Sequence, residues 1–216
     1  MNIAVLIVLA YLVGSIPTAV WVSKRLFGID IREHGSGNAG ATNTFRILGP
    51  KAGTAVMLVD MMKGFIAVKL AIFSPYGALS TEQSVNLQVF LGLFAVVGHI
   101  FPIWAEFKGG KGIATLFGMI LSIQPLVAVS MVGVFMLMLY ITRYVSLSSI
   151  TASIAFPLMI FFIFKEPELS YKIFAIATAF LVVLTHHKNI NRIINGNESK
   201  VAIFRKRRFR RRRHDD

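Results

Sequence analysis

Residues 113–141 read IATLFGMILSIQPLVAVSMVGVFMLMLYI, a stretch of 29 residues without an acidic or basic side chain. About 20 apolar residues are enough for one helix to cross the hydrocarbon of a bilayer. Ser122, Gln124 and Pro125 interrupt the stretch, and proline is favoured in the first turn of a helix. We therefore expect two helices here, the first ending at Ser122 and the second beginning at Pro125.

Similar blocks make up most of the rest of the chain. Five more apolar blocks are expected to be spans: Ile3 to Val22, Gly53 to Phe73, Val85 to Ala105, Val145 to Phe164 and Tyr171 to Thr185. Only Met1 and Asn2 precede the first block, so we interpret it as a retained span and not as a cleaved signal peptide. With the divided block, the sequence predicts an all-α protein, a polytopic membrane bundle of about seven transmembrane helices.

The composition agrees with a membrane protein. Charged residues make up 15% of the 216 residues and hydrophobic residues 55%, with a mean hydropathy of +0.67, whereas a soluble domain has about 25% charged residues. The 23 Lys and Arg exceed the 10 Asp and Glu, which gives a net charge of +13. Because this charge accompanies a membrane-like body, we attribute it to the positive-inside effect and not to nucleic acid. The absence of cysteine excludes disulfides and a catalytic thiol.

The basic residues also predict the topology. They follow the first span over residues 24–51, follow the third span at Lys108 and Lys111, and fill the C-terminal tail, where nine lie in the last 17 positions. The positive-inside rule places all three regions in the cytoplasm, which requires an odd number of crossings with the N-terminus outside. We expect residues 1–198 to form one membrane domain. Residues 199–216 are expected to be a cytoplasmic tail that contacts anionic lipid headgroups.

The first of three polar clusters covers residues 34–46, HGSGNAGATNTFR. Three glycines in six positions let the backbone direct several N–H groups into one concavity, a common way to hold phosphate. A plain glycine-rich turn is the alternative, since such loops alone are weak evidence. The candidate residues of this cluster are Ser36, Gly37, Asn38, Gly40, Thr42, Asn43 and Arg46.

The second cluster is EFKGGKG over residues 106–112, directly before an apolar helix. The helix start supplies free N–H groups and a partial positive charge, to which Lys111 adds a full charge. The spacing of a nucleotide-binding loop and its preceding strand are missing, which disfavours an NTP site. Two lysines that flank a membrane span beside a tight turn are the alternative. The candidate residues are Lys108, Gly109, Gly110, Lys111 and Gly112.

The third cluster, HHKNINR over residues 186–192, ends the last span. If the helix continues, His186 and Asn189 share a face. A neutral imidazole is the usual general base near pH 7, an amide can orient a hydroxyl or phosphate, and Arg192 adds a cation. An ordinary polar helix end is the alternative. No metal is implied, because the histidines are adjacent and no carboxylate has ligand-like spacing.

One charged pair lies inside a predicted span. Asp60 and Lys63 are three residues apart and therefore share a helix face. Ionisable groups within a bilayer are usually paired or functional. We interpret this pair as structural, because a neutralised pair needs no catalytic explanation.

The predicted topology brings the three clusters to one face. Such a site fits one substrate with two phosphates or two substrates with one phosphate each. A transporter of phosphorylated metabolites would also use glycine-interrupted helix ends, but its site would lie near the membrane midplane. A scaffold that recruits anionic lipids through its tail is a further alternative.

Residues 36–43 (SGNAGATN), 108–115 (KGGKGIAT) and 186–192 (HHKNINR), the last followed by Gly196 and Glu198, closely resemble the three motifs of a known family. This is the PlsY family of bacterial acyl-phosphate:glycerol-3-phosphate acyltransferases. The resemblance covers about residues 1–198 and leaves the arginine-rich tail outside. None of the histidines begins the His-x-x-x-x-Asp motif of membrane acyltransferases that use acyl-CoA or acyl carrier protein.

The resemblance implies a reaction and its setting. A fatty acyl group passes from acyl phosphate to the 1-hydroxyl of sn-glycerol 3-phosphate, forming lysophosphatidic acid and phosphate, as the first step of bacterial phospholipid synthesis. It implies direct transfer without an acyl-enzyme or a cofactor, in a multi-pass protein of the bacterial inner membrane with a cytoplasmic active site. The partners are the two substrates and membrane lipids, with no nucleic acid, and the expected state is a monomer. The catalytic candidates are Ser36, Lys111, His186 and Asn189, with the general base left open between His186 and a substrate phosphate.

Overall fold

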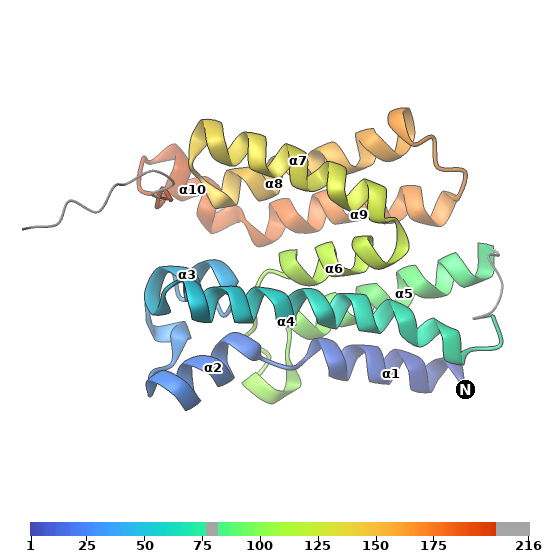
Figure 1. Cartoon of the computed structure of the whole chain (residues 1–216), viewed down its shortest axis with the longest axis horizontal. Helices are drawn as coiled ribbons and strands as arrows, with labels where there is room; N and C mark the ends of the chain where they lie inside the picture. The colour runs from blue at the N-terminus through green and yellow to red at the C-terminus, as the bar shows by residue number, and fades with distance from the viewer. Residues whose placement is uncertain (77–81, 202–216) are drawn as a thin grey trace, which may run out of the picture.

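The computed structural model describes residues 1–76 and 82–201, and every regular element in these ranges is helical (Figure 1). The predicted all-α class is confirmed. The α-helices are α1 Ile3–Gly14, α2 Thr18–Phe27, α3 Ala41–Leu48, α4 Pro50–Lys69, α5 Glu82–Ile100, α6 Ile113–Ile123, α7 Pro125–Thr142, α8 Val145–Leu158, α9 Leu169–Thr185 and α10 His187–Ile194. Most of the predicted tail lies outside the described residues.

The division of the 113–141 stretch is confirmed. Helix α6 ends at Ile123 and α7 begins at Pro125, with Gln124 in a non-helical conformation between them (φ −137°, ψ 82°). The amide of Gln124 donates a hydrogen bond to Glu166, which lies in the connection from α8 to α9. The break between α6 and α7 therefore lies at the same end of the molecule as that connection (Figure 1).

The first expected span, Ile3 to Val22, lies within a helical segment of membrane-spanning length, Ile3–Phe27, but this segment is divided into two helices. Helix α1 ends at Gly14, and α2 begins only at Thr18, after Pro17. Proline lacks an N–H and its ring clashes with the preceding turn, so the first helix does not continue through it. Helix α2 then ends at Gly28, whose left-handed conformation (φ 67°) is the usual helix-terminating one.

Only some of the helices are long enough to span a membrane. Within the described residues, four helical segments are long and apolar enough to cross a membrane: Ile3–Phe27, Glu82–Ala105, Pro125–Thr142 and Val145–Ile163. A fifth results if α9 and α10, which are bent by 59° at their junction, count as one span. Helix α6 is apolar but has only 11 residues. The chain is thus a multi-helix membrane protein, and seven crossings remain a prediction.

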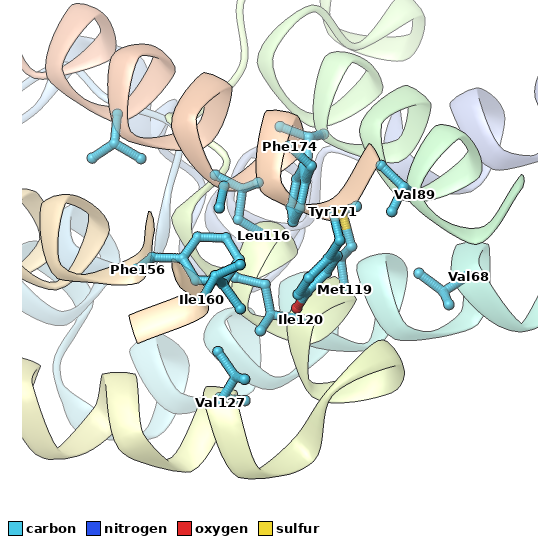
Figure 2. Close-up of a cluster of buried hydrophobic side chains, with 14 of the residues drawn as sticks. Val68, Val89, Leu116, Met119, Ile120, Val127, Phe156, Ile160, Tyr171 and Phe174 are labelled. Atoms are coloured by element: carbon cyan, nitrogen blue, oxygen red, sulfur yellow. The ribbon is translucent and has the colours of Figure 1, made fainter. Parts of the chain in front are cut away.

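The main apolar core lies where α6, α8 and α9 meet (Figure 2). Phe156 packs edge-to-face on both Tyr171 and Phe174, with ring centroids 5.9 and 5.6 Å apart, and Met119 and Ile120 complete the cluster. In a bilayer such contacts act by close packing, since lipid is as apolar as the side chains. The core joins the second half of the chain to α6.

The two ends of the molecule differ. At one end, the Met1 ammonium group donates a hydrogen bond of 2.6 Å to the carbonyl of Phe73, beyond α4. At the opposite end lie α2, α3 and α10 (Figure 1). The predicted clusters around residues 34–46 and 186–192 therefore share one end of the bundle.

Candidate active site

The first glycine loop is organised by Asn43, which lies on α3 and is 1% exposed. Its Oδ1 accepts a hydrogen bond from the Ser36 N–H (3.0 Å), and its Nδ2 donates to the carbonyls of Ile31 and His34. A Cβ at Gly35 would lie 2.4 Å from that Oδ1, and Gly35 also has a positive φ of 63°. The loop is thus wrapped around Asn43, so this side chain supports the loop from within.

The second turn lies on the end of α5. The N–H groups of Gly109 and Gly110 donate to the carbonyls of Ile100 and His99, at 3.1 and 3.2 Å. A Cβ at Gly110 would lie 2.3 Å from His99 Nε2 and 3.0 Å from the carbonyl oxygen of Ala39. Glycine is therefore required for close packing here, and the same position brings the first loop against the second turn. Gly112 then precedes α6 with a φ of 80°.

The third cluster does not form on a continued helix, so the predicted shared helix face of His186 and Asn189 is wrong. Helix α9 ends at Thr185 and α10 begins at His187, with the 59° bend between them. His186 Nδ1 lies 2.8 Å from the carbonyl oxygen of Val182. A carbonyl only accepts, so Nδ1 carries the proton and Nε2 the lone pair. The bend still keeps the two residues close, because the Asn189 N–H donates to the His186 carbonyl at 2.8 Å.

Asn189 joins the second and third clusters. Its Oδ1 accepts a hydrogen bond from Lys111 Nζ, and its Nδ2 donates to Glu198 Oε1 at 2.7 Å. Ser146 Oγ and Arg192 Nε also donate to the Glu198 carboxylate, both at 2.8 Å. Burial raises the pKa of Glu198, but these three hydrogen bonds outweigh it and the net pKa is lowered. An ionised Glu198 therefore holds Asn189 in place against Lys111.

The electrostatics show a concentrated positive site. Burial lowers the pKa of Lys111 to about 8; Glu198 opposes this, whereas the charges of Arg192 and Arg46 lower it further. Burial, followed by the charge of Lys111, lowers the pKa of His186 to about 4. Cations from all three clusters thus act on one another, and such mutually perturbed groups are candidates for a functional site.

Not every predicted residue joins this centre. Gly37 and Gly40 shape the first loop, and Asn38 and Ser36 are partly exposed on it. Thr42 and Arg46 are exposed on α3. The largest departure is Lys108, which is exposed and lies 3.9 Å from Glu106.

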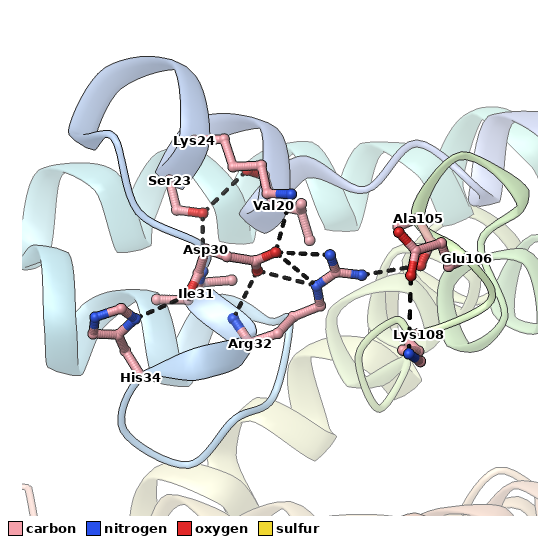
Figure 3. A network of polar contacts seen from close by, with 10 residues as sticks. All are labelled: Val20, Ser23, Lys24, Asp30, Ile31, Arg32, His34, Ala105, Glu106 and Lys108. Carbon is pink, nitrogen blue, oxygen red and sulfur yellow. Dashed lines mark hydrogen bonds and ion pairs between the residues drawn. The ribbon is translucent and has the colours of Figure 1, made fainter.

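Lys108 instead lines a separate hollow of about 410 Å³ with Lys24, Asp30, Arg32, Glu33 and Glu106. Asp30 is the centre of this region (Figure 3). Hydrogen bonds from Arg32 hold its pKa well below the usual range, and Lys24 lies 3.0 Å away. Arg32 also donates to the carbonyl of Ala105 at 3.1 Å. The network connects the segment just before the first loop to the segment just before the second turn. The charge of Asp30 is paired with those of Arg32 and Lys24.

Three residues in or beside the site, Glu198, Ser146 and His99, could not be assigned a role from the sequence. Glu198 was recognised within a motif, but only the fold shows that the chain returns after α10 to place it on Asn189. Ser146 comes from α8, 52 residues from Glu198. His99 had no signal beyond being a histidine near the end of a span.

Fold and site together define a multi-helix membrane protein with a cation-rich, glycine-lined cluster at one end. Residues 4–196 match the glycerol-3-phosphate acyltransferase family. The chain belongs to this family and is an acyltransferase, as the resemblance predicted. A glycerol-3-phosphate acyltransferase of Chlorobium phaeobacteroides is 40% identical over 95% of this chain and 99% of its own length. That of Chlorobaculum parvum is 42% identical over 93% and 97%.

Two solved structures are similar. One is a crystal structure of PlsY, an integral membrane glycerol 3-phosphate acyltransferase, in its glycerol 3-phosphate form, with a TM-score of 0.82 and 39% identity over 92% of this chain and 95% of that one. The other is the lysophosphatidic acid form of PlsY, with a TM-score of 0.79, 39% identity and coverages of 92% and 94%. The membrane fold is therefore shared over nearly the whole chain.

Proposed function

We propose that this acyltransferase uses acyl phosphate as its donor and forms 1-acyl-sn-glycerol 3-phosphate and inorganic phosphate. One observation carries the proposal: Lys111 hydrogen-bonds to Asn189, and the Glu198 carboxylate that holds Asn189 also binds Arg192, so cations of the second and third motifs share one cluster. The first loop packs against the same turn at Gly110. Two substrates that each bear a phosphate repel one another, and only a site with several cations holds them side by side. The glycerol 3-phosphate and lysophosphatidic acid forms of the similar PlsY structures agree with this acceptor and product.

The second turn and first loop are assigned to the phosphates. Lys111 and the N–H groups at the start of α6 bind one phosphate, since a helix N-terminus carries a partial positive charge. Ser36, Arg46 and the loop N–H groups bind phosphate and stabilise the developing charge on the carbonyl oxygen. Asn43 supports this loop from within.

His186 and Asn189 are assigned to the acceptor. The Nε2 lone pair of His186 accepts a hydrogen bond from the 1-hydroxyl and directs its oxygen at the acyl carbon. Before substrate binds, burial and the charge of Lys111 lower the pKa of His186 to about 4, and its Nδ1–H donates to the Val182 carbonyl and not to a carboxylate that would stabilise an imidazolium. We therefore assign the hydroxyl proton to a phosphate oxygen of the substrates and a positioning role to the histidine.

The bond changes then balance in one transfer. The hydroxyl oxygen attacks the acyl carbon, the bond from that carbon to the phosphate oxygen breaks, and the proton leaves on the released phosphate. Acyl phosphate is a mixed anhydride with a good leaving group, so no covalent acyl-enzyme is required.

Replacing His186 tests the positioning role. His186→Gln keeps a hydrogen-bond acceptor near Nε2 but has no basicity, so we expect a KM for glycerol 3-phosphate raised about tenfold with kcat changed by less than about threefold. Steady-state kinetics on the purified variant measures both constants. A kcat reduced by about a hundredfold or more at unchanged KM makes His186 the base instead.

The proposed donor is tested with the purified enzyme, glycerol 3-phosphate and either long-chain acyl phosphate or the matching acyl-CoA. Transfer from acyl phosphate alone, with one phosphate released per acylglycerol phosphate formed, is the expected result. Transfer only from acyl-CoA overturns the donor, and no transfer from either favours transport.

We also propose a multi-pass protein of the bacterial inner membrane whose active site is cytoplasmic. The basic residues within 24–51 and at Lys108 and Lys111 support it, because the positive-inside rule places such segments in the cytoplasm and they lie on the loops that form the site. We further propose that the protein is a monomer and that its basic tail contacts anionic lipid headgroups.

A further inference from the structure

A buried charged cluster lies beneath the site and has no part in the chemistry above. Asp60 and Lys63 of α4 are 1% and 3% exposed, with Lys63 Nζ 2.5 Å from Asp60 Oδ1. His99 of α5 is 6% exposed, and its Nδ1 lies 3.8 Å from the same carboxylate oxygen. The sequence interpretation of Asp60 and Lys63 as a neutralised pair fits the observed contact, but it did not include the histidine.

The backbone and the ring of His99 both face the second turn. The backbone carbonyl of His99 accepts a hydrogen bond from the Gly110 N–H at 3.2 Å, and a Cβ at Gly109 would lie 2.0 Å from the same carbonyl oxygen. A Cβ at Gly110 would lie 2.3 Å from the ring Nε2. The imidazole is thus the surface on which the residue before Lys111 rests. The carbonyl of Ala39 lies against the same glycine, so the first loop depends on this position too.

A purely structural reason does not explain such a pair well. Burying two charges costs more than packing apolar residues of similar volume, and replacing a buried pair is often neutral or stabilising. Asp60 Oδ1 lies 3.8 Å from His99 Nδ1, which is beyond hydrogen-bond length, so the carboxylate acts on that edge of the ring through its charge and not through a bond. Lys63 fixes Asp60, Asp60 faces the Nδ1 edge, and the Nε2 edge lies against the turn.

We propose that Asp60, Lys63 and His99 form a positioning unit that sets the height and orientation of the Gly109–Lys111 turn, and through it the binding of phosphate by Lys111. This inference rests on the proposed role of Lys111 in binding a substrate phosphate. All three residues are buried, so the proposal assigns them no contact with substrate. They affect how tightly the turn binds a substrate phosphate.

The test is a double-mutant cycle between His99→Leu and Lys111→Met in the purified full-length enzyme. KM and kcat are measured for acyl phosphate and for glycerol 3-phosphate, together with inhibition by inorganic phosphate. We expect His99→Leu to raise the KM for one phosphate-bearing substrate about tenfold, with kcat within about threefold. In the Lys111→Met background, the same change is expected to raise that KM less than about twofold, because the group being positioned is gone.

Two variants exclude a general loss of folding. Leu91→Ala creates a cavity in α5 in an apolar cluster away from the turn, so it lowers Tm and leaves both KM values unchanged. His99→Gln keeps a polar side-chain end toward the turn. We therefore expect its KM to rise by less than half as much as the KM of His99→Leu. Thermal unfolding in detergent shows whether His99→Leu and Leu91→Ala are comparably stable.

The outcomes separate the two proposals. If Lys111→Met leaves every KM unchanged, the proposed role of Lys111 fails, and this inference fails with it. If Lys111→Met raises a KM but His99→Leu has no effect, or the two effects multiply independently, only the positioning unit is overturned. If His99→Leu only lowers Tm, as Leu91→Ala does, and leaves both KM values unchanged, His99 is a packing residue.

Discussion

At the scale of single residues, Lys111 carries the sharpest prediction. Its pKa is lowered to about 8, so the side chain is charged below that pH and loses its charge as the pH rises through it. We therefore expect the KM of the phosphate substrate that it binds to rise above about pH 8. A bound anion favours the charged amine, so the corresponding break in kcat lies at higher pH. Initial rates between pH 6 and 10 measure both profiles.

The matched variant for this prediction is Lys111→Arg, which keeps its charge throughout that range. The guanidinium differs in shape from the ammonium group, so the rates of this variant are compared with one another across pH and not with those of the parent enzyme. The basic limb of the KM profile is expected to disappear. A basic limb of unchanged midpoint in this variant assigns the titration to another group.

Residue identities were predictable here, whereas residue roles were only partly so. Lys111 and His186 could be selected because cations and imidazoles beside glycine turns suggest anion chemistry. Asn43 looks the same in sequence as Asn189, yet one lies inside its loop and the other joins two clusters. Which partners an amide finds depends on chain segments that are far apart in sequence, and motif spacing does not encode them.

At the scale of elements, a helix break was predicted where an apolar block was too long for one span, and breaks inside blocks of ordinary length were missed. The end of α6 followed from Gln124 and Pro125 within a stretch of 29 residues. The break before α2 was missed because Ser15, Pro17 and Thr18 lie within a block that has the length of a single span, and their small side chains barely lower its hydropathy. The bend at His186 has no breaker residue, and it is set by contacts of α10 with α8 and α9.

Helices α4 and α6 cross at two glycines, which gives a prediction about how α6 holds the second turn. A Cβ at Gly118 would lie 1.8 Å from the carbonyl oxygen of Met61, and one at Gly64 would lie 1.9 Å from that of Thr115. Gly118→Ala must therefore push the helices apart, at a cost of about 1–3 kcal/mol. We expect a lower Tm and a raised KM for the phosphate substrate, because α6 begins directly after Lys111.

Gly133 on α7 provides the matched control. A Cβ there meets nothing within 4 Å, and alanine favours a helix over glycine by about 1 kcal/mol in soluble hosts. Gly133→Ala is expected to keep Tm and kinetics at or slightly above those of the parent. Equal losses of stability in both variants would contradict a specific α4–α6 contact.

At the scale of the whole molecule, the prediction of seven passes depends on whether the short helix α6 crosses the membrane. Helix α6 runs from the turn at Lys111 to Gln124, which contacts Glu166 at the far end, and α7 returns to Arg143. The Arg143 carbonyl accepts the Val201 N–H beyond α10, which places that return at the site end. At about 1.5 Å per residue, 11 residues cover only about half of the hydrocarbon thickness. If α6 does cross, the second turn and Lys111 lie closer to the membrane centre than the ends of the neighbouring helices do.

Thiol labelling tests this topology, because the sequence contains no cysteine and single introduced cysteines give no background. Gln83, Pro125 and Lys188 are exposed, at the start of α5, the start of α7 and on α10. With the N-terminus outside and seven crossings, a membrane-impermeant maleimide added to intact spheroplasts labels Gln83→Cys and Pro125→Cys, and it labels Lys188→Cys only after lysis. Labelling of Pro125→Cys only after lysis, with Gln83→Cys still labelled from outside, would show that α6 does not reach the outer surface. The charge argument for an odd number of crossings would then need another span.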